Sequence, residues 1–377
     1  IMNILLLNEW GFRGVGTELY TQVVYRELLR FGINVVKASI RGFDYDVKLE
    51  SSGSALKKFY DFKLMRSLRD IITKFGIDLV YVNLLHAPSA FNFHRVMTQQ
   101  RVPYIIAVHL WEYVCPTSYR VMLPEVKPCN LRSVSWHRLR CVYHDTKSLV
   151  QPLLRVPYNW YVFNKYLKDA LVILVPNEEY AGILRGRGYN AIYKPLPYDY
   201  SSIKPTPGGD GSVCFVGRLS WYKGIDVINY VARHMPDTTF HVMGGGTYKP
   251  ESPNINYHGA VSDEEKFRIL STCSVVMVPS IWAEVSPYVA YEAFALAKPV
   301  VAFDHGGQGE IVRKAKAGLL ARPYNYNDFL DKVRQLLSDE GLARELGLNG
   351  RRWLEENASP TKYVADLLDL LRSYGLT

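Results

Sequence analysis

The stretch SVVMVPSIWAEVSPYVAYEAFALAKPVVAF, residues 274–303, contains the pattern that decides the fold. Four consecutive apolar residues, 275–278, predict a short buried strand. Ser286 and Pro287 predict a helix start, because serine is a frequent N-cap and proline is favoured at the first helical position. A second apolar run, 300–303, predicts the next strand. The order strand, helix, strand is the repeating unit of a parallel α/β sheet.

Two carboxylates flank this predicted helix start. Glu284 lies in the loop before it, and Glu292 follows eight residues later on the first turns of the helix. The backbone N–H groups at a helix start form a favourable anion site. Carboxylates beside such a site can accept hydrogen bonds from hydroxyl groups. The stretch therefore suits an anion that carries hydroxyl-rich groups, as a sugar nucleotide does.

The same alternation of strands and helices runs in both directions from this stretch, in two halves. The interruption is PTPGGDG, residues 205–211, which is typical of a linker. We expect an α/β protein with two Rossmann-like domains, open and mostly parallel sheets, and a cleft between them where the strands end. The expected boundaries are 1–204 for the first domain, 212–358 for the second domain, and 359–377 for a C-terminal helix that crosses back to the first domain.

Composition excludes several classes of protein. The 377 residues are 48% hydrophobic and 21% charged, which is ordinary for a globular protein, and no apolar run approaches the ~20 residues that span a bilayer. The N-terminal ILLL is too short for a signal-peptide core, so we interpret it as a strand. We therefore expect a cytoplasmic protein, with a peripheral position at the inner face of the membrane as a further hypothesis.

Positive charge is concentrated in the N-terminal half. Residues 1–205 contain 27 Lys and Arg against 16 Asp and Glu, a net charge of +11, whereas residues 206–377 contain 18 against 20, a net charge of −2. Such asymmetry indicates a local anionic partner, either anionic lipid or an acidic acceptor, unless the charges are simply scattered over the surface. No helix-turn-helix, zinc-finger or RNA-binding motif is present, so we expect no nucleic acid partner.

Four motifs of the C-terminal half occur in a characteristic order. They are VGRLSWYKGID at 216–226, the Glu284 and Glu292 pair, EAFALAKPVVAF at 292–303, and GGQGEIV at 306–312. With them, the chain resembles family 4 retaining glycosyltransferases of the GT-B fold over nearly its whole length. The glutamates match the E-x7-E motif of that family, and GGQGEIV resembles the loop that follows it.

The resemblance implies a set of groups that bind the donor phosphates. Arg218 and Lys223 match the arginine and lysine of the family motif, and Arg218 offers forked donors suited to phosphate oxygens. Gly16 matches a glycine whose amide lies near the phosphates. Pro287 replaces a residue that would supply an N–H, which leaves the amides of Tyr288 and Val289 as phosphate donors.

The resemblance also implies the residues that contact the sugar. Glu284 would contact donor-sugar hydroxyls near the reacting carbon, Glu292 the ribose, and Ser286 would also belong to the sugar- and ribose-binding set. His109, expected at the end of a strand, matches a histidine that faces the donor sugar. Glu284 and His109 are the candidate catalytic residues.

The implied activity is retaining transfer of a sugar from a nucleotide-diphospho-sugar to a hydroxyl acceptor, which is a glycan, a lipid-linked molecule or a small molecule. Charge that develops on the leaving diphosphate would be stabilised without a metal or other cofactor. Two alternatives stay open. One is a GT-B nucleotide-sugar epimerase, and the other is a catalytically inactive binding protein with the same scaffold.

Three other signals have more than one interpretation. Asp44-Tyr45-Asp46 spells D-x-D, a metal-binding triplet in another glycosyltransferase fold, but it is common by chance. Cys115, Cys129 and Cys141 could bind zinc, form a disulfide or stay thiols. The aromatic and basic segment 150–166 could contact a membrane surface or pack in the core of the first domain.

Overall fold

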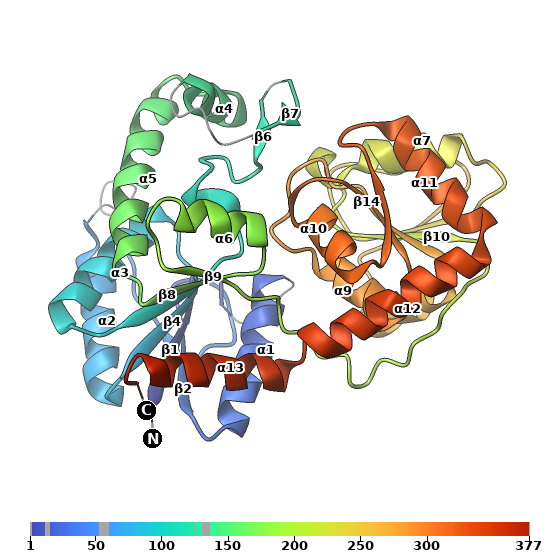
Figure 1. Cartoon of the computed structure of the whole chain (residues 1–377). Helices are drawn as coiled ribbons and strands as arrows, with labels where there is room; N and C mark the ends of the chain where they lie inside the picture. Colours follow the sequence, from blue (N-terminus) through green and yellow to red (C-terminus); the bar gives the residue numbers. More distant parts are fainter. Residues whose placement is uncertain (1, 12–15, 53–59, 124, 130–135, 377) are drawn as a thin grey trace. The chain divides into compact units, whose positions relative to one another are not determined.

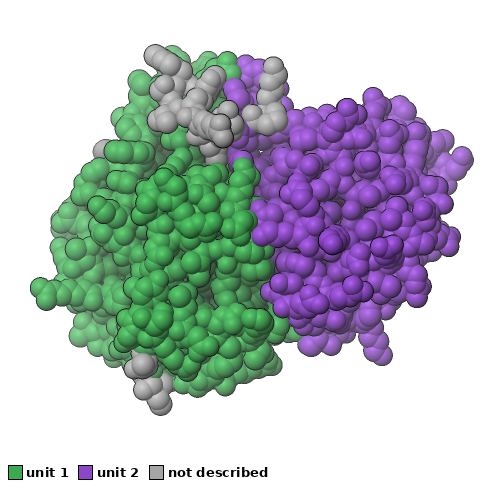
Figure 2. All heavy atoms as spheres, in the orientation of Figure 1, with its two compact units in different colours: residues 1–118, 133–199, 358–377 green, residues 119–132, 200–357 purple. Residues whose placement is uncertain are grey.

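The computed structural model describes residues 2–11, 16–52, 60–123, 125–129 and 136–376 (Figure 1). The chain divides into two compact units (Figure 2). Unit 1 contains residues 1–118, 133–199 and 358–377, and unit 2 contains residues 119–132 and 200–357. Each unit is built around one parallel sheet and is described by itself.

The sheet of unit 1 has seven strands in the order β3-β2-β1-β4-β5-β8-β9, and all neighbours pair in parallel. Their bounds are β1 (Asn3–Asn8), β2 (Asn34–Ser39), β3 (Val47–Lys48), β4 (Leu79–Leu84), β5 (Tyr104–Ala107), β8 (Val172–Val175) and β9 (Ala191–Tyr193). The central strands β4, β5 and β8 are apolar along nearly their whole length, because helices cover both faces of such a sheet.

The helices of unit 1 are α1 (Thr17–Arg30), α2 (Phe62–Phe75), α3 (Ala87–Gln100), α4 (Trp136–Thr146), α5 (Val150–Lys168), α6 (Glu178–Arg185) and α13 (Pro360–Ser373), with a short 3-10 turn η2 (Trp111–Tyr113). Two of them differ from expectation. Sequence reasoning predicted an irregular segment over 110–150 and a helix only from 159 onward. Instead α4 and a longer α5 form, although Pro157 lies inside α5, because the buried side of α5 packs against α3 and α4.

The sheet of unit 2 has six strands in the order β12-β11-β10-β13-β14-β15, again all parallel. They are β10 (Val213–Val216), β11 (Phe240–Met243), β12 (Ile255–Gly259), β13 (Val275–Val278), β14 (Val300–Phe303) and β15 (Gly318–Ala321). Residues 119–132 also belong to this unit, although in the sequence they lie between two segments of unit 1. They include the antiparallel pair β6 (Val121–Met122) and β7 (Lys127–Pro128).

The helices of unit 2 are α7 (Ile225–Arg233), α8 (Asp263–Thr272), α9 (Tyr288–Ala295), α10 (Gly306–Ala315), α11 (Tyr326–Ser338) and α12 (Glu340–Asn357), and η3 (Trp221–Lys223) is a 3-10 turn before α7. β13 and β14 have the bounds that the apolar runs predict. The segment 306–312, expected as a loop, instead forms the start of α10. Two parallel sheets with helical crossovers confirm the predicted α/β class.

For three of the cysteines, the structure has one of the three possibilities that the sequence left open. Cys115, Cys129 and Cys141 are thiols, and the disulfide joins Cys214 on β10 to Cys273 just before β13. These two residues lie 59 positions apart in the chain, on segments that run beside each other in the sheet of unit 2. Nothing in their sequence spacing indicates the pairing.

The C-terminal helix α13 packs in unit 1 against α1, with a buried cluster of three tyrosines at the contact. The hydroxyl of Tyr363 on α13 lies 2.6 Å from that of Tyr20 on α1 and 3.4 Å from that of Tyr81 on β4. The hydroxyls of Tyr20 and Tyr81 also hydrogen-bond each other. All three side chains are buried, so these hydroxyls depend on one another for hydrogen bonds.

We predict that Tyr363→Phe lowers the free energy of unfolding by about 1–2 kcal/mol, because it removes a buried hydrogen-bonding group from this cluster. Tyr374→Phe, at the C-terminal end of the same helix, is the matched control. Its hydroxyl accepts a 2.8 Å hydrogen bond from Asn190 at an exposed site, so its loss should cost less than about 0.5 kcal/mol. Urea denaturation of both variants measures the difference, and equal losses would contradict a structural role for the tyrosine cluster.

Candidate functional site

Close approach of the backbone brings three loops of unit 2 together at the carboxyl ends of their strands. Gly224 follows η3 with φ of 83°, and a Cβ there would lie 2.1 Å from the carbonyl oxygen of Pro279. Gly307 lies at the start of α10, where a Cβ would lie 2.0 Å from the carbonyl oxygen of Val285. Only glycine fits both positions, so these residues let the loops after β10, β13 and β14 meet.

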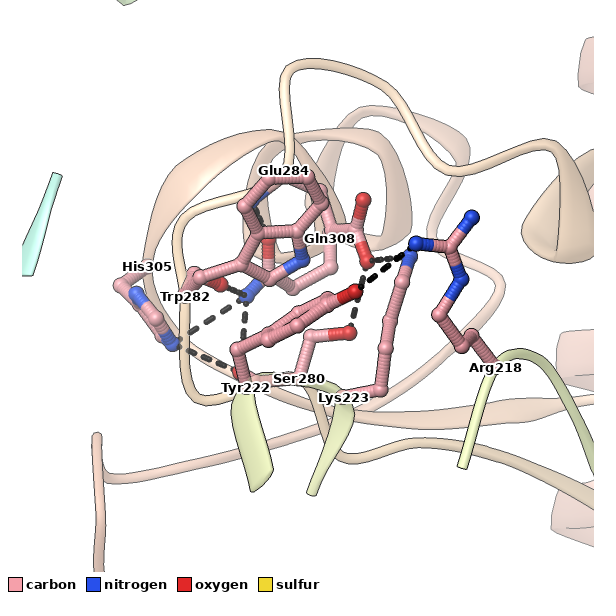
Figure 3. Close-up of polar contacts among 8 residues, drawn as sticks. All are labelled: Arg218, Tyr222, Lys223, Ser280, Trp282, Glu284, His305 and Gln308. Carbon is pink, nitrogen blue, oxygen red and sulfur yellow. Dashed lines mark hydrogen bonds and ion pairs between the residues drawn. The ribbon is translucent and has the colours of Figure 1, made fainter. Parts of the chain in front are cut away.

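The meeting point of the first two loops is an ion pair. Lys223 Nζ lies 2.5 Å from Glu284 Oε1, and the hydroxyl of Ser280 donates to the same oxygen at 2.7 Å. Figure 3 shows these three side chains converging. The carboxylate of Glu284 is buried to 8% exposure, whereas Lys223 retains 26%. Two of the predicted site residues, 61 positions apart, are therefore in direct contact.

Gln308 holds the loop that carries Glu284. Its Oε1 accepts a 2.9 Å hydrogen bond from the amide of Glu284, and its Nε2 donates to the carbonyls of Ser280 and Trp282 (Figure 3). His305 lies beside it, with ring Nε2 3.1 Å from the carbonyl of Ser280. Burial lowers the pKa of His305 to about 4, so its ring is neutral at physiological pH. This support fixes the loop before any ligand arrives.

Arg218 lies next to this ion pair, at an exposed position two residues after the end of β10. Its Nη1 donates to the hydroxyl of Tyr222 at 3.4 Å, a long hydrogen bond that leaves most of its guanidinium donors to solvent (Figure 3). The amine of Lys223 also lies 5.1 Å from the ring centroid of Trp282, within cation–π range. Arg218, Lys223 and Glu284 therefore form one polar cluster backed by aromatic rings.

Glu292 has a separate partner. Its Oε1 lies 2.8 Å from Nζ of Lys266 on α8, which also contacts Asp263 at 2.7 Å. Burial raises the pKa of Glu292, and the pairing with Lys266 opposes that rise. Burial alone would lower the pKa of Lys266, but Glu292 and Asp263 raise it above its usual value. The carboxylate is thus kept in a buried position, 7% exposed, by a cation that the sequence did not single out.

The start of α9 differs from expectation in one respect. Ser286 was predicted to cap the helix, but the N-cap is Pro287, with no side-chain cap hydrogen bond. The Ser286 hydroxyl instead lies 3.2 Å from the Tyr291 hydroxyl. Because the helix begins at Tyr288, the amides of Tyr288 and Val289 are among the first-turn N–H groups that no helical carbonyl can satisfy.

Two further predicted site residues belong to unit 1. Gly16 has φ of 74° and starts α1, where nothing lies within 4 Å of an added Cβ. Val15 and most of the glycine-bearing turn lie outside the described residues. His109 follows β5 rather than ending it, and its ring packs edge-on against Tyr20 at 4.7 Å. Burial lowers its pKa to about 3, so the ring is neutral, and within the described chain its Nε2 has no hydrogen-bond partner.

Sequence reasoning missed three supporting residues, Ser280, Gln308 and Lys266. Gln308 lies inside GGQGEIV, so the motif marked its position, but the role of its amide depends on how α10 packs. Lys266 lies 26 positions before Glu292, and no local signal links them. The D-x-D triplet is engaged elsewhere, since Asp44 pairs with Lys37 at 3.1 Å and Asp46 accepts from the Lys37 amide.

Comparison with known proteins adds to this geometry. Residues 199–353 match the family model for glycosyl transferases group 1. An uncharacterized glycosyltransferase of Methanocaldococcus jannaschii is 32% identical over 174 residues, which is 44% of this chain and 47% of that protein. The chain spans less than half the length of the curated relatives that it matches.

Solved structures match nearly the whole chain. Sucrose-phosphate synthase from Thermosynechococcus elongatus has a TM-score of 0.75 and 18% identity, with 99% of each chain covered. Anabaena HepE, solved in complex with UDP-glucose, has a TM-score of 0.73 and 15% identity, with 99% of this chain and 100% of that chain covered. The predicted GT-B fold is confirmed.

We predict that Lys266→Met destabilises the protein by about 3 kcal/mol at pH 7, because Glu292 is left buried and ionised without its partner. The loss should shrink toward pH 4. At a pH below the pKa that Glu292 has in the unfolded chain, its carboxyl is protonated in both the folded and the unfolded state, so it contributes no pH dependence. At a higher pH the unfolded chain ionises more readily than the folded protein, in which burial raises the pKa, and the folded state loses stability. Denaturant titrations at both pH values test this, with Lys266→Arg as the control that keeps the cation. A pH-independent loss would contradict the ion-pair role.

Proposed function

We propose that this protein transfers a sugar from a nucleotide-diphospho-sugar to a hydroxyl acceptor. The match of residues 199–353 to the family model for glycosyl transferases group 1 supports this proposal. The observation that carries the proposal is the cluster of Arg218, Lys223 and Glu284 at the carboxyl ends of β10 and β13, beside the first-turn amides of α9. It combines two cations for a diphosphate with a held carboxylate for sugar hydroxyls.

The roles of these groups follow from their chemistry. Lys223 and Arg218 neutralise the diphosphate, together with the amides of Tyr288 and Val289. The amine of Lys223 is already oriented by its contact with Glu284, and a bound phosphate would replace or share that contact. Glu284 then accepts from hydroxyls of the donor sugar. Glu292, which lies on α9 and pairs with Lys266, accepts hydrogen bonds from the ribose hydroxyls.

The proposed step retains the configuration at the anomeric carbon. The acceptor oxygen forms its bond to that carbon on the face from which the phosphate leaves. The bond between the anomeric carbon and the phosphate oxygen breaks, its electron pair goes to the leaving diphosphate, and a phosphate oxygen takes the acceptor proton. The cations stabilise the charge that grows on the diphosphate, so the proposed reaction requires no metal ion.

Two groups of unit 1, Gly16 and His109, are proposed to contact the donor. The Gly16 amide is assigned to the phosphates, and its positive φ is a conformation that glycine adopts readily. The ring of His109 is neutral, and its buried Nε2 has no hydrogen-bond partner among the described residues, so we propose that it hydrogen-bonds a sugar hydroxyl without adding charge.

We expect Arg218→Ala to weaken nucleoside diphosphate binding by about 10- to 100-fold, because hydrogen bonds to charged groups contribute about 1.5–3 kcal/mol. Thermal stabilisation by UDP, GDP and ADP identifies the preferred base, and titration of that nucleotide gives the affinity. The same variant should slow release of the diphosphate from its matching nucleotide sugar.

Arg344→Ala is the control for this experiment, because Arg344 is an exposed arginine on α12 outside the cluster. Nucleotide binding in EDTA should equal binding with Mg²⁺, as the metal-free proposal requires. If no nucleotide stabilises the wild-type protein, or if both arginine variants bind equally well, the proposed donor site is wrong.

We also propose that α5 binds an anionic membrane surface. Its exposed side is apolar over its first turns, with Leu153 65%, Leu154 62% and Trp160 63% exposed, and becomes basic at Lys165 and Lys168. An apolar helical face next to lysines, on the unit that carries the excess positive charge, suits insertion among anionic lipid headgroups. Within the described residues, no helix has both the length and the apolar character needed to cross a bilayer.

We predict that the double variant Leu153→Ala, Leu154→Ala reduces binding to vesicles of 30% phosphatidylglycerol in phosphatidylcholine at least about tenfold, since two partly inserted leucines contribute more than 1.4 kcal/mol together. Co-sedimentation measures the bound fraction. Leu348→Ala, which truncates an exposed leucine of unit 2, is the control. Equal binding of the wild type to pure phosphatidylcholine vesicles, or no loss in the double variant, would refute the membrane proposal.

A further inference from the structure

Unit 2 contains an open pocket that the donor-site residues do not line. Its volume is about 960 Å³, at the upper end of the roughly 300–1,000 Å³ range of small-molecule sites. It lies where the segments after β10, β13 and β15 meet the starts of α7 and α11. Its lining residues are Val126, Trp221, Asp226, Tyr230, Ile281, Pro323, Tyr324, Asn325, Tyr326 and Asn327.

Four aromatic rings form much of the lining. Tyr230 and Tyr326 pack edge to face with centroids 5.6 Å apart, and Trp221 approaches from η3. Tyr324, three residues after the end of β15, has φ of 61°, which is a strained conformation for a bulky residue. These rings are partly buried: they pack against the hydrophobic core of unit 2 and also line the pocket.

Polar groups lie between these rings. Asp226 is exposed on the first turn of α7, and in the described part of the chain it has no ion-pair partner. Asn325 uses its side-chain oxygen to accept from the amide of Asp328 at 2.9 Å, and Asn327 uses its oxygen to accept from the Tyr230 hydroxyl. Among the described residues, both asparagines therefore retain side-chain N–H donors for a ligand.

We propose that this pocket binds one or two pyranose rings of a saccharide acceptor. A pyranose has an apolar face of C–H groups that stacks on aromatic rings, and a rim of hydroxyls that both donate and accept hydrogen bonds. Trp221 and Tyr326 supply the stacking surfaces, Asp226 accepts from ring hydroxyls, and the asparagine amides donate to them. The mixture of flat apolar walls with neutral and acidic polar groups matches a neutral saccharide better than a phosphate.

The pocket is connected to the proposed donor site without being part of it. Trp221 lies two residues before Lys223, Ile281 adjoins Trp282, and the ring of Tyr324 lies 5.3 Å from that of His305, which contacts Gln308. The ribose carboxylate Glu292 instead pairs with α8, whereas the pocket lies over α7 and α11. The inference rests on the proposed function only in assigning the saccharide to the acceptor; saccharide binding itself can be measured without a donor.

The test uses the full chain and a panel of neutral probes, maltotetraose, cellotetraose and α-1,6-mannotetraose. Saturation-transfer NMR detects binding, and calorimetric titration of the bound probe gives its dissociation constant. Tyr326→Ala should increase that constant about tenfold through lost stacking, and Asp226→Ala about fivefold or more through a lost charged acceptor. Nucleoside diphosphate affinity should change less than about twofold in both variants.

Tyr257→Ala is the matched control, because Tyr257 is an exposed tyrosine on β12, at the opposite edge of the sheet from β15. It should leave saccharide binding unchanged. The inference is overturned if no probe binds, if the two pocket variants bind as tightly as the control, or if they lose nucleotide rather than saccharide affinity. Saccharide binding without any nucleotide binding would instead leave the pocket in place and refute the donor site.

Discussion

The contact between the Lys223 amine and the Glu284 carboxylate is the constraint on which the rest of unit 2 depends. It joins the ends of β10 and β13, and it requires those loops to approach more closely than any side chain at Gly224 or Gly307 would allow. The disulfide between Cys214 and Cys273 links β10 to a residue that lies just before β13. The close approach of the backbone therefore determines where the charged side chains lie.

Each buried carboxylate of the candidate site already has a cation. Glu284 has Lys223 and the Ser280 hydroxyl, and Glu292 has Lys266. Leaving either one unpaired would be costly at its low exposure, so the ion pairs hold both carboxylates in position. A diphosphate and its hydroxyl groups would then enter a site whose charges need little rearrangement, which is the condition for electrostatic stabilisation of a leaving group.

The two proposed surfaces outside the donor site differ in chemistry and in origin. The exposed side of α5 is aliphatic and ends in lysines, which suits lipid, whereas the pocket over α7 and α11 alternates aromatic rings with carboxylate and amide groups, which suits sugars. Taken with the proposed donor site, they lead us to propose an enzyme that acts on a saccharide acceptor near a membrane surface. The donor site, the membrane surface and the saccharide pocket are three separate proposals, and each can be refuted while the others hold.

The sequence by itself determined the class of fold and the neighbourhood of the site. The apolar runs at 275–278 and 300–303 form β13 and β14, because a hydrophobic run is a local signal. The motifs also marked Lys223 and Glu284 as site residues, and the structure brings these two residues into contact. Only the tertiary structure decided that Lys266 pairs with Glu292, that Cys214 bonds to Cys273, and that Pro287 rather than Ser286 precedes α9. Those outcomes depend on which segments pack together across tens of residues, and neither residue spacing nor propensity encodes that packing.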